Sequence, residues 1–139
     1  MLYEMLAVEM LAIRSNFMQI PAHQKVSKLL RGECFVLNYL DAKGGSAHPK
    51  ELSEKLAVST ARIASLLNHL EEKRLITRTT DAEDSRQIIV QITLEGTQRI
   101  KQIRKDVLEH TARMLEKLGP EDAQEYIRIQ KKIYQNFSE

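Results

Sequence analysis

The sequence is poor in cysteine, proline, glycine and tryptophan. Among its 139 residues are one cysteine, three prolines, five glycines and no tryptophan. The single cysteine, Cys34, excludes a disulfide framework within the chain and is typical of a protein from a reducing compartment. So few prolines and glycines favour long helices separated by a small number of turns.

The chain also has no long apolar run. No segment reaches the ~18 consecutive apolar residues that a membrane-spanning helix needs, so we expect no membrane partner. Residues 1–20 are apolar enough to be compared with an export signal, but Glu4 and Glu9 interrupt them and no basic leader precedes them. We therefore interpret this segment as a helix of a cytoplasmic protein.

Motifs that carry common enzyme chemistry are missing too. The sequence contains no nucleophile elbow, no glycine-rich phosphate loop and no recognised zinc spacing. His110 has Asp106 and Glu109 near it on one helix, but the four histidines are otherwise scattered. We expect neither an enzyme nor a bound metal or cofactor. The net charge of +2 is too small to indicate a nucleic-acid-binding surface unless the positive charge is local or doubled by pairing of two chains.

Apolar residues recur at helical spacing through most of the chain. This periodicity predicts helices over residues 1–20, 33–40, 50–56, 59–74, 95–118 and 120–137, with 22–32 as a connector that can be helical. Pro21, the pair Gly44-Gly45 and the pair Gly119-Pro120 separate them. We therefore expect a mainly α fold.

Two of these helices fit a helix-turn-helix. Residues 57–59 form a short turn, and Ser59 is a good N-cap for the second helix. One sector of that helix is apolar, with Ile63, Leu66, Leu67 and Leu70. The opposite side is small and polar and carries Ala61, Ser65, Asn68 and Glu72, flanked by Arg62 and His69. This is the pattern of a recognition helix that reads DNA.

The hydrophobic period changes after residue 74. Residues 75–79 are rich in β-branched side chains, residues 86–92 alternate, and the loop between them, 80–85, holds three acids. Two strands around a polar loop predict a β-hairpin. A helix-turn-helix followed directly by a small β-hairpin wing is a winged helix-turn-helix.

The terminal helices raise the question of assembly. Residues 1–20, 95–118 and 120–137 each carry an apolar stripe, and a winged helix of roughly 60 residues cannot cover all of them. Either the three helices pack on one another within one chain, or two chains intertwine them. We favour a homodimer, because regulators with a winged helix-turn-helix read two-fold DNA sites. The expected division of the single domain 1–139 is 1–31 and 97–139 as N- and C-terminal dimerisation helices and 32–96 as the DNA-binding lobe.

Two short segments of the chain resemble the MarR (multiple-antibiotic-resistance regulator) family. The segment RTTDAEDSR at 78–86 and the segment VQITLEG at 90–96 are similar to the family's wing. The segments ELS at 51–53 and STARI at 59–63 stand at the right distances before it, and the order of elements agrees over nearly the whole chain. The resemblance implies a sequence-specific double-stranded-DNA-binding transcriptional regulator with a pseudo-palindromic site, a repressor released by a small-molecule effector or an oxidant. The alternative is a winged-helix protein–protein interaction module without sequence-specific DNA binding.

The recognition helix is expected to enter the major groove and the wing to lie along the minor groove. The expected DNA-binding residues are Ser59, Thr60, Ala61, Arg62, Ser65, Asn68, His69, Arg78, Asp84 and Arg86. We expect Asp81 and Asp84 to orient Arg86 or Arg78 by bidentate pairing. Where the family usually has glycine at the end of the recognition helix, this chain has Arg74. Either Arg74 adopts a left-handed backbone conformation at a cost of about 1 kcal/mol, or the helix ends differently.

The sequence does not identify the signal that such a regulator would sense. Cys34 is either a redox switch near a helix N-terminus or, as we favour, a buried structural thiol. A small-molecule pocket between the dimer helices and the winged helix would be lined by residues such as Met10, Arg14, Phe17, Phe35 and Tyr39.

Overall fold

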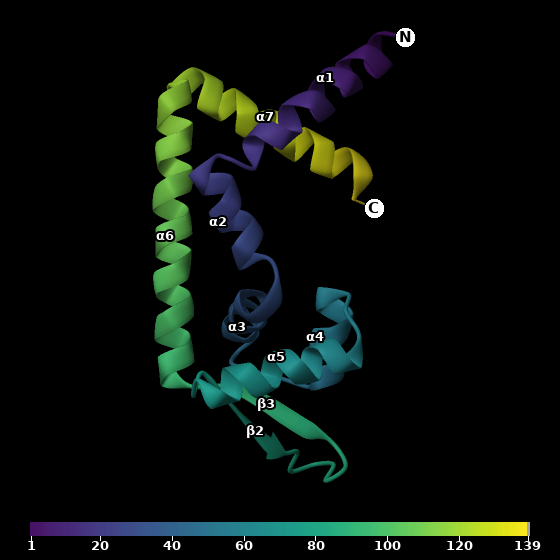
Figure 1. Cartoon of the computed structure of the whole chain (residues 1–139), viewed down its shortest axis with the longest axis vertical. Coiled ribbons are helices and arrows are strands. Elements are labelled where there is room, and N and C mark those ends of the chain that lie inside the picture. The colour runs from purple at the N-terminus through teal and green to yellow at the C-terminus, as the bar shows by residue number, and fades with distance from the viewer. Residues whose placement is uncertain (139) are drawn as a thin grey trace.

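The computed structural model describes residues 1–138, which form helices and a small antiparallel sheet (Figure 1). In chain order the elements are α1 (Leu2–Phe17), α2 (Pro21–Leu29), α3 (Gly32–Ala42), β1 (Ser46–Ala47), α4 (Pro49–Leu56), α5 (Thr60–Glu72), β2 (Ile76–Thr80), β3 (Ile88–Ile92), α6 (Leu94–Leu118) and α7 (Pro120–Phe137). The expected mainly α winged helix-turn-helix is confirmed. No helix among these residues is long and apolar enough to cross a membrane.

The structure adds two elements that the sequence did not define. Residues 22–32, expected as a connector that can be helical, contain most of the regular helix α2, which has Pro21 in its first turn, a position where the missing N–H costs nothing. The strand β1 is only two residues long, too short to show alternation, and pairs with β3 through Ala47 and Val90. The sheet order is therefore β1-β3-β2, with the predicted hairpin β2–β3 in it.

The core lies between α3, α5, the sheet and the first turns of α6. Its fully buried side chains include Val36, Leu40, Leu52, Ile63, Leu67, Leu70, Ile76, Val90 and Ile100. All four residues of the predicted apolar sector of α5 are buried. Burial of that sector turns the opposite, polar strip of α5 toward solvent. Ile100 in this core also shows that α6 is shared between the winged helix and the terminal helices.

The recognition helix ends in a Schellman turn at Arg74. Arg74 has φ +62°, the left-handed conformation that was one of the two alternatives from sequence. The Arg74 N–H donates to the Glu71 carbonyl at 2.9 Å, and the Leu75 N–H donates to the Leu70 carbonyl at 3.0 Å. Leu70 and Leu75 are both buried, which is the apolar contact that accompanies this turn. The helix therefore ends in the conformation that glycine favours, although no glycine is present.

The start of α6 is hydrogen-bonded to this turn. The Thr93 N–H donates to the Leu75 carbonyl at 3.0 Å, and the Thr93 hydroxyl donates to the Arg74 carbonyl at 2.8 Å. The same hydroxyl caps α6 by accepting from the Gly96 N–H at 3.0 Å. A Cβ atom at residue 96 would overlap the Leu75 carbonyl oxygen. Only glycine therefore allows α6 to approach the backbone at this distance.

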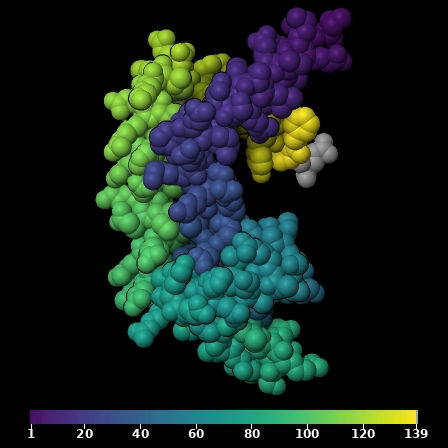
Figure 2. All heavy atoms as spheres, viewed as in Figure 1, coloured from purple at the N-terminus to yellow at the C-terminus, as the bar shows by residue number. Residues whose placement is uncertain are grey.

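The long helix α6 runs along one side of the molecule and connects two parts of the fold (Figure 1). The winged helix lies at one end of α6, and α1 and α7 lie at the other. The space-filling view shows α1 projecting from the body and an open side between the end of α7 and the winged helix (Figure 2). Residues 2–16 of α1 are all exposed, as is most of α7.

We expect Gly96→Ala to destabilise the fold, because the added methyl group meets backbone that cannot move aside as a side chain does. The expected loss is roughly 1–3 kcal/mol of unfolding free energy, the range for overpacking. Urea unfolding followed by circular dichroism measures it. The control is Gln98→Ala, an exposed change on the same helix, which should stay within about 0.5 kcal/mol of the wild type. Equal midpoints for the two variants would contradict the proposed close approach.

Candidate nucleic-acid interface

The recognition helix α5 presents the polar strip that the sequence predicted. Ser59 is its N-cap, and the Ser59 hydroxyl accepts from the Arg62 N–H at 3.1 Å. Most of the proposed contact residues on this helix are exposed, namely Ser59, Thr60, Ala61, Arg62, Asn68 and His69, and Ser65 is half-buried. At 100° per residue, Ala61, Ser65 and Asn68 lie at the centre of the strip, while Arg62 and His69 lie on one flank.

Arg78 does not point freely toward a ligand. It lies on β2, and its Nη2 donates to Asn68 Oδ1 and to Glu71 Oε1, both at 2.8 Å. The guanidinium of Arg78 beside Glu71 holds the pKa of that carboxyl below its ordinary value. The expected pairing of Arg78 with Asp81 or Asp84 is therefore wrong. Arg78 instead joins the first strand of the wing to the recognition helix and orients the Asn68 side chain.

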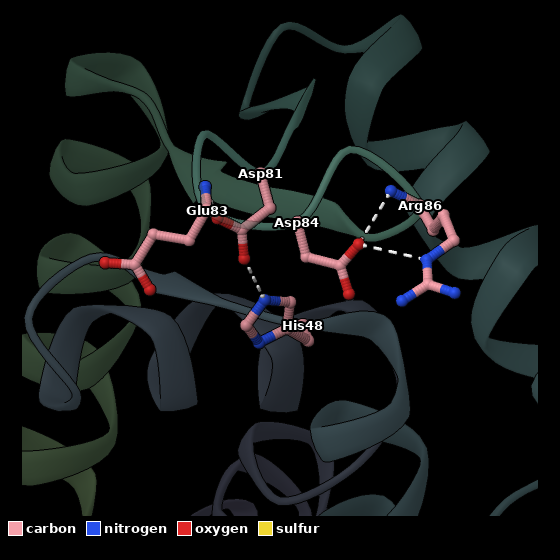
Figure 3. Close-up of polar contacts among 5 residues, drawn as sticks. All are labelled: His48, Asp81, Glu83, Asp84 and Arg86. Carbon is pink, nitrogen blue, oxygen red and sulfur yellow. Dashed lines mark hydrogen bonds and ion pairs between the residues drawn. The ribbon is translucent and has the colours of Figure 1, made fainter.

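Arg86 and Asp84 pair within the wing loop, as expected, but not in a bidentate manner. Asp84 Oδ1 accepts from the backbone N–H of Arg86 at 3.1 Å and from its Nε at 3.3 Å (Figure 3). The Arg86 side chain is 89% exposed. Among residues 1–138 its terminal Nη atoms have no hydrogen-bond partner. Asp84 thus fixes the near end of the guanidinium and leaves the far end available to a ligand.

Asp81 has a partner that the sequence did not indicate. Its Oδ2 lies 2.9 Å from Nε2 of His48, the residue before α4 (Figure 3). Its Oδ1 accepts from the Glu83 N–H at 2.9 Å, and its own N–H donates to the Gln87 carbonyl at 2.9 Å. The hydrogen bond from His48, followed by that from the Glu83 N–H, holds the pKa of Asp81 below its ordinary value. Asp81 therefore fastens the wing loop to the helix-turn-helix, and no sequence spacing marks His48 for this role.

The residues named for sensing fall in three places. Cys34 is half-buried rather than buried, and it lines a groove beside the recognition helix. Phe35 and Tyr39 stack with ring centres 6.0 Å apart, and the Tyr39 hydroxyl donates to Glu51 at 2.7 Å. Met10, Arg14 and Phe17 line a separate cavity of about 440 Å³ between α1 and α7. The five candidate pocket residues therefore do not share one cavity. Residues 1–138 contain no cluster of three or more metal-ligating side chains.

Comparisons with known proteins agree with this architecture. Residues 27–87 match the model of the MarR family. The chain is 26% identical over 98 residues to the HTH-type transcriptional repressor YetL of Bacillus subtilis, an alignment that covers 70% of this chain and 59% of YetL. The chain therefore spans less than two thirds of that relative's length.

Solved structures with the same fold cover nearly the whole chain. YusO from Bacillus subtilis has a TM-score of 0.76 at 24% identity, with 96% of this chain and 95% of YusO aligned. A mutant of Staphylococcus aureus MepR bound to an oligodeoxyribonucleotide has a TM-score of 0.64 at 22% identity, with 95% and 98% aligned. At these identities the likeness supports the fold, terminal helices included.

We expect His48→Ala to raise the pKa of Asp81 toward the ordinary 3.8, because the largest cause of the lowered value is removed. Since the folded-state pKa is depressed, the pairing stabilises the wing above the ordinary pKa and is lost as pH falls through the lowered value. A carboxyl-carbon NMR titration of Asp81 measures this. His23→Ala is the control, because His23 lies near Phe17, away from the wing. An Asp81 titration that is the same in the His48 variant and the wild type would refute the fastening role.

Proposed function

We propose that the chain is a member of the MarR family, whose model matches residues 27–87, and that it is a sequence-specific DNA-binding transcriptional regulator that works as a homodimer. One observation carries the proposal: an outward polar strip on α5 and an extended Arg86 are held in a fixed relation by hydrogen bonds. Major-groove reading by a helix and minor-groove reading by an arginine need such a relation, because the two grooves of DNA have a fixed spacing.

Each proposed contact residue has a role that its position allows. Ser59 and Thr60 at the start of α5 contact phosphate, where the helix N-terminus also favours an anion. Ala61, Ser65 and Asn68 face base edges, and Arg62 and His69 face the backbone or a guanine. Arg86 enters the minor groove. Arg78 and Asp84 act indirectly, by orienting Asn68 and Arg86.

The homodimer rests on apolar surface that one chain leaves uncovered. On α1 the exposed apolar side chains include Leu2, Tyr3, Met5, Leu6, Val8, Met10, Leu11 and Ile13. On α7 they include Tyr126, Ile129, Ile133, Tyr134 and Phe137. Large exposed apolar patches are rare on monomeric proteins and mark interaction sites. The packing of all three terminal helices on one another within one chain, the alternative from sequence, would have buried this surface. We propose that a second copy covers it and that the division into dimerisation helices and DNA-binding lobe holds, with α6 common to both.

The direction of regulation is taken from relatives. YetL is named as a transcriptional repressor, and we propose the same role for this chain, acting in the cytoplasm where its DNA would be. Release of the DNA by a small molecule or an oxidant stays a prediction from the family resemblance. The family is one of transcriptional regulators, and we propose no enzymatic activity.

Selection of bound duplexes from a random pool tests the function. We expect the purified full-length chain to enrich a pseudo-palindromic site whose half-sites are about one helical turn apart. If no duplex is enriched while the protein is folded by circular dichroism, sequence-specific DNA binding is excluded under those conditions. The chain would then fit the protein–protein interaction module.

The selected duplex also tests the wing. Arg86→Ala should weaken binding roughly tenfold or more, in line with ~1–3 kcal/mol for a specific arginine contact. Lys117→Ala, at the far end of α6, removes the same charge from an exposed site and should leave the affinity unchanged. Equal affinities for the two variants would remove Arg86 from the interface.

A further inference from the structure

We propose that a groove beside the recognition helix is a second anchor for the DNA backbone, in which Lys28 and Arg31 bind phosphate although both lie outside the helix-turn-helix. This inference rests on the proposed function. The groove has a volume of about 500 Å³ and lies between the α2–α3 corner and one flank of α5. It is lined by Lys28, Arg31, Gly32, Glu33, Cys34, Arg62, Leu66 and His69.

The three cations that line this groove, Lys28, Arg31 and Arg62, have no acidic partner within residues 1–138. Lys28, Arg31, Arg62 and His69 are all exposed, and within residues 1–138 none of their side chains forms a hydrogen bond or an ion pair. The one acid among the lining residues, Glu33, is already paired with Lys73 at 2.8 Å. Lys28, Arg31 and Arg62 thus bring three unpaired positive charges together in a chain whose net charge, with histidine counted as neutral, is only +2. Such a site attracts a phosphate-type oxyanion.

The position of the groove favours DNA as the source of that oxyanion. Arg62 and His69 belong at once to the groove and to the flank of the strip that would enter the major groove. A helix in the major groove has a phosphate backbone on each side of it. On the other flank the cation Arg78 is neutralised by Glu71. Unpaired positive charge would therefore face the DNA backbone on the flank of α5 beside the α2–α3 corner, where Lys28 and Arg31 lie.

Binding to the DNA backbone by basic side chains has a measurable signature. Each phosphate neutralised by a basic side chain releases counterions, so the logarithm of the binding constant falls with the logarithm of salt concentration by about 0.9 per neutralised phosphate. Phosphate binding positions a protein without reading sequence. Replacement of Lys28 and Arg31 by neutral residues should thus reduce the salt dependence and leave the preferred sequence unchanged.

The test is a salt titration on the selected duplex with wild type, a groove variant and a matched control. The groove variant is Lys28→Gln with Arg31→Gln. The control is Lys105→Gln with Lys117→Gln, which removes the same charge from exposed, unpaired positions on α6. We expect the salt slope of the groove variant to fall by about 0.9 for each phosphate that is no longer neutralised, at both half-sites of a dimer. The control should keep the wild-type slope, and all three proteins should select the same site.

Two results would overturn the proposal. One is a salt slope of duplex binding that is the same for the groove variant and the control. The other is saturable binding of inorganic phosphate that requires Lys28 and Arg31, together with an unchanged DNA slope, which would make the groove a site for a small anion. Either result leaves the wild type bound to its duplex and the proposed function intact. Failure of the wild type to enrich any duplex would instead count against the function itself.

Discussion

The arrangement of the winged helix depends on the backbone of Arg74 and Leu75. Three elements meet there: the end of α5, the start of β2 and the first turn of α6. The Leu75 N–H closes the Schellman turn on Leu70, and the Leu75 carbonyl accepts from Thr93 and lies against Gly96. Because these interactions involve backbone atoms, they fix the angles between the elements more firmly than side-chain packing alone would.

The two parts of the proposed DNA surface are held relative to each other by additional polar interactions. Arg78 joins β2 to Asn68 and Glu71 of the recognition helix, and Asp81 joins the wing loop to His48 before α4. None of these side chains is deeply buried, so each interaction contributes little to global stability. Their effect is to restrict the position of the wing, and the proposed reading of two grooves depends on that position.

Sequence periodicity predicted the order of the main elements because the apolar faces of the helices are long and regular. The burial of Ile63, Leu66, Leu67 and Leu70 followed directly from their spacing. The left-handed conformation of Arg74 was one of two alternatives suggested by the family's usual glycine at this position, and the structure shows which of them holds. By contrast, β1 has two residues and is defined only by its pairing with β3. Short strands of this kind leave no pattern in the sequence.

The polar partners were less predictable than the elements. The acids of the wing were expected to pair with arginines nearby in sequence, and Asp84 does so with Arg86. Asp81 instead pairs with His48, 33 positions away, and Arg78 with residues of the helix before it. The cations of the groove, Lys28 and Arg31, were overlooked because they precede the helix-turn-helix and approach it only through the α2–α3 corner. Interactions between segments distant in sequence require the folded geometry.

In the proposed homodimer a second copy of the chain covers α1 and α7, and the two recognition helices face two half-sites. The most direct measurement is the mass of the full-length chain in solution by multi-angle light scattering at micromolar concentration. We expect the mass of two chains, with no dissociation on dilution to the concentrations used for DNA binding. The mass of a single chain under those conditions would contradict the homodimer, because the apolar faces of α1 and α7 would then need another partner.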